Sequence, residues 1–368
     1  MKIYARHLIN SSIGKLEIAQ SYVDKVKLLD YWKLQDAALA REFARSKFLV
    51  MIDRKLIVEK KNKDLRIVQH DNESLKKTLG DYGLTFDMSN SCLLDAVESQ
   101  NELVPLFGTA ITAADPPDDS PVNKKQVMAE LAKDLGGELI SVRMAMLTMN
   151  DEKQRSLLAR FQSLTNWHTI YRRCPKCAQA LKMRASKSGA QCVPCQRIYY
   201  PHFSPVTITL VTDVTNQNLL LVRHRGSING VFTNVAGFSE VGESLVECAR
   251  REIAEELGLE TLEIDSLNLS QAWPMPDSSL MVAHIAKVDM DQKISICPDE
   301  LETAKWFTRA EVAAALKKTE ADPFLKNLPT TLEERQVLHY IPPQGAIAHT
   351  MIKNWVNGLY DDRFASKL

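Results

Sequence analysis

Three glutamates, Glu252, Glu255 and Glu256, stand at spacings i, i+3 and i+4 in a segment rich in helix-forming residues. On a helix this spacing brings the three carboxylates to one face. Because three like charges side by side repel, the cluster is best stabilised by a hard dication. Carboxylate oxygens, retained waters and substrate phosphates are the ligands that Mg²⁺ prefers. The spacing predicts a helix that binds a divalent cation; the alternative is an acidic helix face that is only solvated.

The elements around these glutamates predict how they are positioned. An apolar stripe of Val246, Ala249, Ile253 and Leu257 can dock a helix over about 244–257 on a sheet. Gly258 is placed to end that helix with a left-handed cap. The chain before it reads as two strands, 207–214 and 218–223, joined by a turn. After it, strands are expected at 266–273, 279–288 and 302–307, and helices at 309–317 and 345–358.

The full segment at 237–259 is GFSEVGESLVECARREIAEELGL, which fits G-x5-E-x7-R-E-U-x-E-E-x-G-U, where U is a bulky aliphatic residue. It resembles the Nudix box, and the resemblance implies an α/β/α sandwich and hydrolysis of a nucleoside diphosphate linked to another group. By the same resemblance Glu252, Glu255 and Glu256 bind the catalytic Mg²⁺ or Mn²⁺, with the backbone carbonyl of Ala236 as a further ligand. Arg251 would hold the box together by pairing with Glu243 or a neighbouring carboxylate.

Four of the seven cysteines form a C-x2-C-x14-C-x2-C pattern, typical of a structural zinc ribbon whose four thiolates surround the ion and leave no open position. The ligands predicted for zinc are Cys174, Cys177, Cys192 and Cys195. Disulfide pairing and chance clustering are the alternatives. An odd number of cysteines, with four of them clustered, favours a reducing compartment.

The segment SQAWPMPDSSLM at 270–281 resembles the SQPWPFPxS signature of the NADH pyrophosphatase branch of the Nudix family, which also carries a ribbon ahead of its Nudix domain. Ala272 replaces a proline, Met275 replaces a phenylalanine, and one residue is inserted before Leu280. The alternative is a proline-rich surface loop. The substrate contacts implied here are Gln271, Trp273, Pro274, Met275, Pro276 and Ser278.

Further short elements resemble the same branch. Tyr200 would stack on a base of the substrate across a homodimer, and Phe238 would be the second stacking aromatic, unless both are packing residues. His202 stands where the branch usually has arginine. Glu300 corresponds to a further metal or catalytic carboxylate, with a solvated loop carboxylate as the alternative. Ala348 corresponds to a residue that lines the dinucleotide site.

These patterns divide the chain into an α+β domain at 1–166, a zinc ribbon at 167–202 and a Nudix domain with a C-terminal helix at 203–358. The 46 basic and 46 acidic residues balance, so no global field draws the protein to nucleic acid or an anionic membrane. The sequence has no run of 18 apolar residues, so no membrane-spanning helix is predicted. The first 16 residues are basic and free of acidic residues, which predicts a mitochondrial location, with the cytoplasm as the alternative.

The function that this sequence predicts is divalent-metal-dependent hydrolysis of NADH, NADPH or NAD⁺ to nicotinamide mononucleotide and AMP or its 2′-phosphate, by a homodimer. Removal of an NAD cap from RNA breaks the same bond, so the motifs do not separate these two activities. A non-catalytic binding module built from the ribbon and an idle Nudix fold is the alternative from another class. The intact carboxylate set speaks against the idle module.

Overall fold

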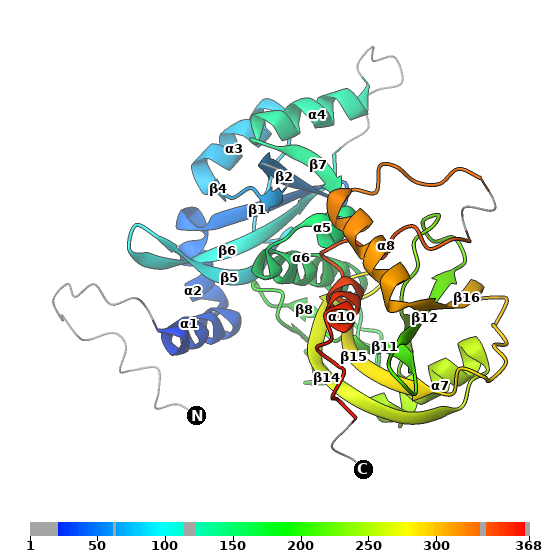
Figure 1. Cartoon of the computed structure of the whole chain (residues 1–368). Coiled ribbons are helices and arrows are strands. Elements are labelled where there is room, and N and C mark those ends of the chain that lie inside the picture. Colours follow the sequence, from blue (N-terminus) through cyan, green and yellow to red (C-terminus); the bar gives the residue numbers. More distant parts are fainter. Residues whose placement is uncertain (1–20, 62–63, 114–122, 332–335, 365–368) are drawn as a thin grey trace.

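The computed structural model describes residues 21–61, 64–113, 123–331 and 336–364, and three separate sheets lie within this part of the chain (Figure 1). The basic segment at 1–16, predicted to direct the protein to mitochondria, lies outside the described residues. No helix of the described residues is long and apolar enough to cross a membrane.

The first sheet lies in the N-terminal region, where β1 and β2 form a hairpin whose turn contains Asp53 and Arg54. Its central order is β3-β2-β1-β6-β5, with β4 beside β1 and β7 beside β2. The strands are β1 (Lys47–Ile52), β2 (Lys55–Lys61), β3 (Asp64–Ile67), β4 (His70–Asp71), β5 (Ser91–Ser99), β6 (Glu102–Ile111) and β7 (Glu138–Ser141). The helices are α1 (Tyr22–Leu34), α2 (Asp36–Glu42), α3 (Asn72–Asp81), α4 (Lys124–Asp134), α5 (Val142–Thr148) and α6 (Glu152–Ile170).

Successive residues of β1 point to opposite faces of this sheet, as a strand requires. Phe48 and Val50 belong to the core under α1 to α4, whereas Leu49 and Met51 belong to the core under α5 and α6. At Gly108 of β6 an added Cβ would meet the Phe161 ring at 2.4 Å, so glycine lets α6 approach the sheet closely. Both faces are therefore covered by helices.

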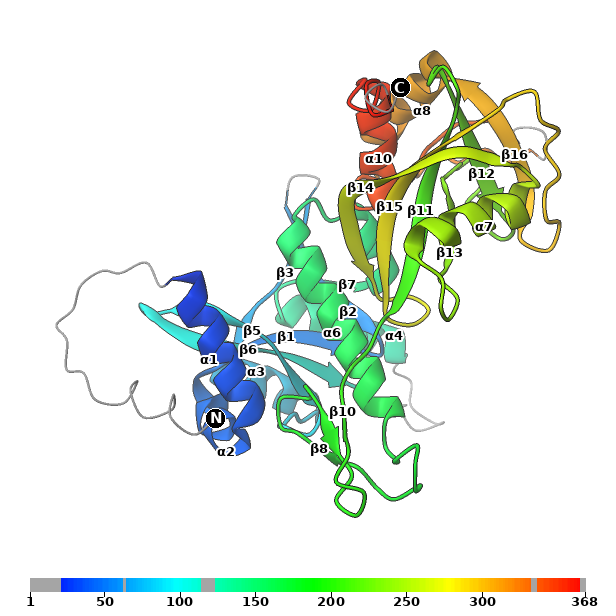
Figure 2. The ribbon, with the colours of Figure 1, turned by 90° about the horizontal axis from the view of Figure 1, so that it is seen from below.

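The cysteine-rich segment forms a small sheet of β8 (Lys182–Met183), β9 (Ala190–Gln191) and β10 (Ile198–Tyr199). The tip of its first hairpin is fastened to the N-terminal region. The amide of Ala185 donates to the Asp36 carboxylate at 2.9 Å, and the amide of Leu93 donates to the Ser186 carbonyl at 3.1 Å. Figure 2 shows β8 and β10 beside the end of α6, with β11 leading away from them.

The third sheet has the order β14-β15-β11-β12-β16, with β13 beside β11. Its strands are β11 (Ser204–Asp213), β12 (Asn218–His224), β13 (Val235–Phe238), β14 (Thr261–Trp273), β15 (Ser279–Val288) and β16 (Leu301–Thr308). The associated helices are α7 (Leu245–Leu257), α8 (Arg309–Ala321) and α10 (Ile347–Val356).

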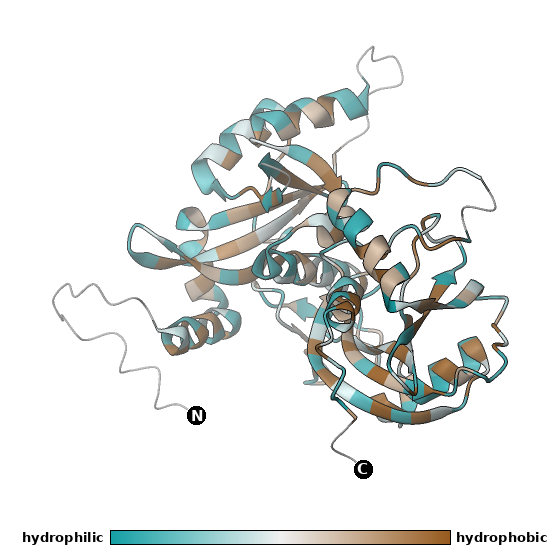
Figure 3. Cartoon of the chain, in the orientation of Figure 1, coloured by the Kyte–Doolittle hydropathy of each residue, from teal (hydrophilic) through white to brown (hydrophobic). Residues whose placement is uncertain are grey.

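Alternation along the strands builds two cores on opposite faces of this sheet. Leu219 and Leu221 of β12 pack in the core that includes α8 and α10, whereas Leu220 and Val222 pack under α7. In Figure 3 the helices α7 and α8 carry both brown and teal positions, as expected of helices with one face against this sheet. The predicted α/β/α sandwich, preceded by an α+β region, is confirmed.

The predicted elements of this sandwich are present, with boundaries that shift by a few residues except at β14, which begins five residues earlier than expected. One detail of the predicted stripe is wrong: Val246 is 38% exposed, whereas Ala249, Ile253 and Leu257 are buried. Val246 has the right angular position, but it lies in the first turn of α7. The buried face instead includes Glu252 and Glu256.

Candidate active site

Local signals at both ends set the position of α7. The Ser244 side chain accepts from the Glu247 amide while the Glu247 side chain accepts from the Ser244 amide, which forms a capping box. Gly258 ends the helix at φ +67°, as its place in the sequence predicts. The glutamates of the box are therefore carried on a helix with both ends fixed.

Arg251 links the acidic side chains of the box. Its guanidinium donates to Glu243 at 2.7 Å, to Glu252 at 2.8 Å and to Glu255 at 2.9 Å. The hydrogen bonds from Arg251 lower the pKa of Glu243 to about 2. A fourth bond, at 2.8 Å, reaches the Phe238 carbonyl and ties the loop before the helix to it. The expected pairing of Arg251 with Glu243 is confirmed.

Gly237 lies directly against Glu252. A Cβ at this position would be 1.9 Å from the carboxylate carbon, closer than any real contact. Only glycine leaves room for β13 and α7 to approach with the Glu252 side chain between them. This close approach is the physical reason for a glycine at the start of the motif.

Glu256 is the most deeply buried carboxylate of the set, with 2% of the residue exposed. Burial raises its pKa to about 8, and the charges of Glu252, Glu300 and Glu255 act in the same direction. Its Oε2 atom is buried and has no hydrogen-bond partner. Buried carboxylate oxygens ordinarily accept a hydrogen bond, and this one does not.

These residues fit a divalent cation, because a cation would supply the partner that Glu256 lacks and would offset the repulsion among the carboxylates. Burial raises the pKa of Glu252 as it does that of Glu256, and the charge of the exposed Glu300 acts in the same direction on both. Glu255 is also exposed and turns toward Arg251. Among the described residues, only the four cysteines bring a full set of candidate metal-binding atoms within 4.8 Å of one another.

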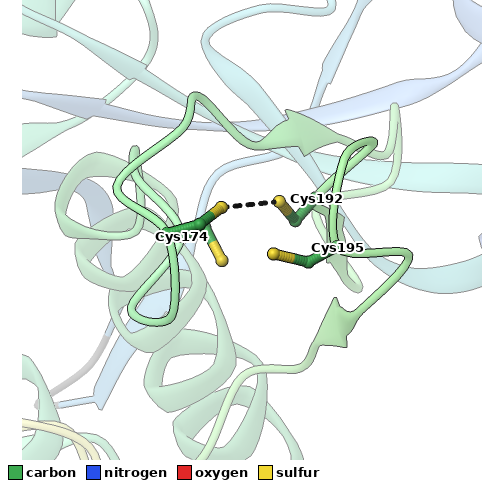
Figure 4. Close-up of side chains that lie close together, drawn as sticks. Cys174, Cys192 and Cys195 are labelled. Atoms are coloured by element: carbon green, nitrogen blue, oxygen red, sulfur yellow. Dashed lines mark hydrogen bonds between the residues drawn. The ribbon is translucent and has the colours of Figure 1, made fainter.

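The four cysteine sulfurs form that compact group, and Figure 4 shows Cys174, Cys192 and Cys195 pointing into a common space. A tetrahedral site with Zn–S bonds of about 2.3 Å needs sulfurs about 3.8 Å apart, and the Cys177 and Cys192 sulfurs are 3.5 Å apart. A hydrogen bond with the Tyr199 hydroxyl lowers the pKa of the Cys174 thiol to about 6. The cluster therefore fits a zinc ion, and all four cysteines are free of disulfides.

The element that resembles the NADH pyrophosphatase signature joins three parts of the molecule. The Gln271 side-chain amide donates to the Gly345 carbonyl at 2.7 Å and accepts from the Ile347 amide at 2.8 Å. Trp273 and Met275 pack against the N-terminal core under α5 and α6. Gln271 also lines a cavity of about 140 Å³ between α6 and the start of α10.

The other predicted contact residues lie in different surroundings. Ala348 is buried in the core beneath α10, and Ala236 is half-buried in β13, where it pairs with Ile208. Tyr200 and Phe238 are 56% and 50% exposed. Within the 270–281 element, Pro274 is buried, Ser278 is half-buried and Pro276 is exposed.

Sequence reasoning missed two residues near Glu300, both at the end of β12. Arg223 is buried and pairs with Glu302 at 2.8 Å, which fixes the end of β12 to β16. His224 follows it opposite Leu301, and burial lowers its pKa although the charge of Glu300 acts the other way. The signal in the sequence that could have revealed both residues is that polar side chains follow the apolar run of this strand.

Comparison with known proteins identifies several relatives. The NUDIX domain model matches residues 202–328. NAD-capped RNA hydrolase ndx-9 of Caenorhabditis elegans is 64% identical over 337 residues, covering 92% of this chain and 90% of that protein. The mitochondrial NAD(P)H pyrophosphatase NUDT13 of Mus musculus is 30% identical over 97% of both chains. NAD-capped RNA hydrolase NUDT12 of Homo sapiens is 32% identical over 56% of this chain and 42% of its own.

Proposed function

The chain belongs to the Nudix hydrolase family, in the branch of NADH pyrophosphatases and NAD-capped RNA hydrolases, and we propose that it hydrolyses the pyrophosphate bond of NADH, NADPH or NAD⁺. The products are nicotinamide mononucleotide and AMP or its 2′-phosphate. The observation that carries this proposal is the buried Glu256 carboxylate, whose unpartnered oxygen lies in the field of Glu252 and Glu300.

Mg²⁺ or Mn²⁺ would be held by Glu252, Glu255 and Glu256, with Glu300 and the Ala236 carbonyl as further ligands. When bound, the ions activate water and offset the charge that builds on the phosphoryl oxygens. A non-catalytic binding module is disfavoured. Burying the Glu256 carboxylate without a partner lowers the stability of the fold, and a bound cation would offset this loss.

The protein side chains orient these ligands. Arg251 pairs with Glu252 and Glu255, whereas the Oε2 atom of Glu256 has no hydrogen-bond partner. Because Arg251 also holds the Phe238 carbonyl, the same guanidinium sets the position of the loop that carries an exposed aromatic ring. Phe238 would stack on a base of the substrate beside the carboxylates.

NAD-capped RNA is the second candidate substrate, because the relative with 64% identity over most of the chain carries that name. The test compares kcat/KM for NADH, NADPH, NAD⁺ and NAD-capped RNA under Mg²⁺ and under Mn²⁺, with ADP-ribose and diadenosine polyphosphates as controls. We expect cleavage of at least one NAD-containing substrate, and its loss in Glu256→Gln. Preference for the control nucleotides, or full activity in that variant, would refute the proposal.

A homodimer would let Tyr200 serve the site of the neighbouring subunit. Its ring is exposed and lies under the Arg184 guanidinium, whose central carbon is 5.6 Å from the ring centre. Mixing Tyr200→Ala with Glu256→Gln subunits should restore part of the activity, because one site of the heterodimer has both residues intact. No recovery in verified heterodimers would mean that Tyr200 serves its own subunit or only packs.

Two further assignments complete the proposal. The ribbon would hold one structural Zn²⁺ through its four cysteines. The protein would act in mitochondria, which is supported by the basic N-terminus and by relatives named as mitochondrial. A fusion of residues 1–40 to a fluorescent reporter tests the location, and a diffuse cytosolic signal would indicate the cytoplasm instead.

A further inference from the structure

The zinc ribbon at 167–202 carries a charge unlike that of the whole chain. The chain is neutral overall, with 46 basic and 46 acidic residues, but the ribbon contains no acidic residue at all. Its seven basic residues are Arg172, Arg173, Lys176, Lys182, Arg184, Lys187 and Arg197. A Zn²⁺ ion with four thiolates adds two negative charges, which leaves the loaded ribbon at about +5.

Most of this charge is free to meet a ligand. Five of the basic side chains are exposed, namely Arg172, Arg173, Lys176, Lys182 and Arg197. Within the described residues none of these five forms an ion pair with a carboxylate, whereas Lys25 pairs with Asp95 and Arg363 with Asp265 elsewhere. The ribbon is therefore an uncompensated basic surface, which favours a polyanionic partner.

Exposed aromatic rings connect this surface to the proposed active site. Phe203 is 60% exposed and directly precedes β11. In β11, Val206 pairs with Phe238, and the Ser239 amide donates to the Pro205 carbonyl at 3.0 Å. The box loop therefore lies against the segment by which the chain leaves the ribbon. Phe238 and Phe203 mark a route from the box to the basic side chains.

We propose that this ribbon surface binds the single-stranded RNA that follows an NAD cap. Basic side chains contact phosphates and exposed rings stack on bases, a combination that suits single strands of any sequence. The inference rests on the proposed function, because the cap must lie among the carboxylates for the RNA to continue over Phe238. It adds that the ribbon distinguishes capped RNA from the free dinucleotide.

Direct binding tests the surface without reference to catalysis. The probe is a 12-nucleotide RNA with a 5′-monophosphate and no cap, and its affinity is measured by fluorescence anisotropy as a function of salt. Each phosphate contact contributes about 0.7 to the salt slope for single strands. The double variant Lys176→Gln/Lys182→Gln should lower the slope by about 1.4 and the affinity about 25-fold at 0.1 M salt.

The matched control is Lys76→Gln/Lys77→Gln, which removes two exposed lysines from α3 in the N-terminal region. It should leave the affinity within about twofold of the wild type. Lys176→Arg/Lys182→Arg should retain binding, and zinc content and melting temperature confirm that each variant is folded. Equal affinity of both glutamine variants for the RNA would overturn the proposal.

Kinetics separate this proposal from the proposed function. The double glutamine variant should keep kcat/KM for NADH and lose about 25-fold for NAD-capped RNA, and Phe203→Ala should weaken RNA binding by about 5- to 150-fold. If the wild type binds RNA through the ribbon but cleaves neither substrate, only the proposed function fails. If the variant loses dimerisation or binding to anionic lipid vesicles while RNA binding is unchanged, the ribbon surface serves another partner and this inference is wrong.

Discussion

Replacing Glu256 by glutamine should stabilise the protein when no divalent cation is bound, and lower its hydrolase activity by several orders of magnitude. The carboxylate is buried beneath α7, and burial raises its pKa to about 8 from an ordinary value of 4.5. Glutamine has nearly the same shape and no charge. It therefore removes the cost of ionisation without leaving a cavity.

The size of the effect follows from the two pKa values. Between pH 4.5 and 8 the folded protein holds a proton on Glu256 that the unfolded chain has lost, so stability falls as pH rises through this window. At pH 7 the cost is about 3 kcal/mol, and at pH 5 it is about 1 kcal/mol. Glu256→Gln should therefore raise the free energy of unfolding by up to these amounts, with the larger gain at pH 7.

The assay is urea unfolding at pH 5 and pH 7, on zinc-loaded protein freed of Mg²⁺ and Mn²⁺. Glu255→Gln is the matched control, because its side chain is exposed and its ion pair with Arg251 is worth at most about 1 kcal/mol. Added Mg²⁺ should stabilise the wild type more than Glu256→Gln, since only a ligand of the folded state raises stability by mass action.

Two results would refute this reasoning. Equal stability of Glu256→Gln and wild type at pH 7 would mean that the carboxylate meets a partner in the folded protein. A gain of the same size at pH 5 and pH 7 would mean that it comes from packing and not from charge. Activity close to that of the wild type would remove Glu256 from the catalytic machinery.

Three further predictions concern the ribbon, the box glycine and the stacking residues. Purified protein should contain about one zinc per chain by elemental analysis, and Cys192→Ser should lose the ion and much of its thermal stability. Gly237→Ala should displace the carboxylate beneath it and cost about 1–3 kcal/mol, whereas Gly80→Ala, which meets nothing within 4 Å, should not destabilise α3; equal effects would contradict the close-approach argument. Tyr200→Ala or Phe238→Ala should lower kcat/KM for NADH about 5- to 150-fold, and an unchanged value would assign the ring to packing.

The features of the site that could be predicted from the sequence are those that depend on residues close together in the chain. The spacing of the box glutamates, the cap at Gly258 and the pairing of Arg251 with Glu243 all arise within one loop and one helix. The spacing of the cysteines is likewise enough to predict that their four sulfurs come together. The burial of Glu256 depends on strands that come before and after it in the chain, so helical spacing alone could not reveal it.

Contacts between distant segments account for what the sequence did not reveal. Nothing in the 270–281 element indicates that Gln271 bonds the Gly345 carbonyl, 74 residues away. The N-terminal sheet depends on a parallel pairing of β1 with β6, which joins Lys47 to Leu106. Such pairings are fixed by the way in which whole sheet faces pack. The alternation of residues along one strand indicates only which of them share a face.

The N-terminal region gains a role from these distant contacts. One side of its sheet packs against Trp273 and Met275, within the element that resembles the substrate signature. Another part holds the ribbon hairpin through Asp36 and Leu93. The 270–281 element and the ribbon hairpin are thus both attached to the N-terminal region, although neither belongs to it.

This attachment explains why a ribbon without an open metal position can matter for catalysis. If Zn²⁺ is lost, the ribbon loses the centre that orders its knuckles, and the segment between β10 and β11, which carries Tyr200, loses its support. The 270–281 element would stay in place, because Trp273 and Met275 are held by a separate core. Zinc loss should therefore raise KM for NADH more than it lowers kcat, whereas a change in the carboxylates should act mainly on kcat.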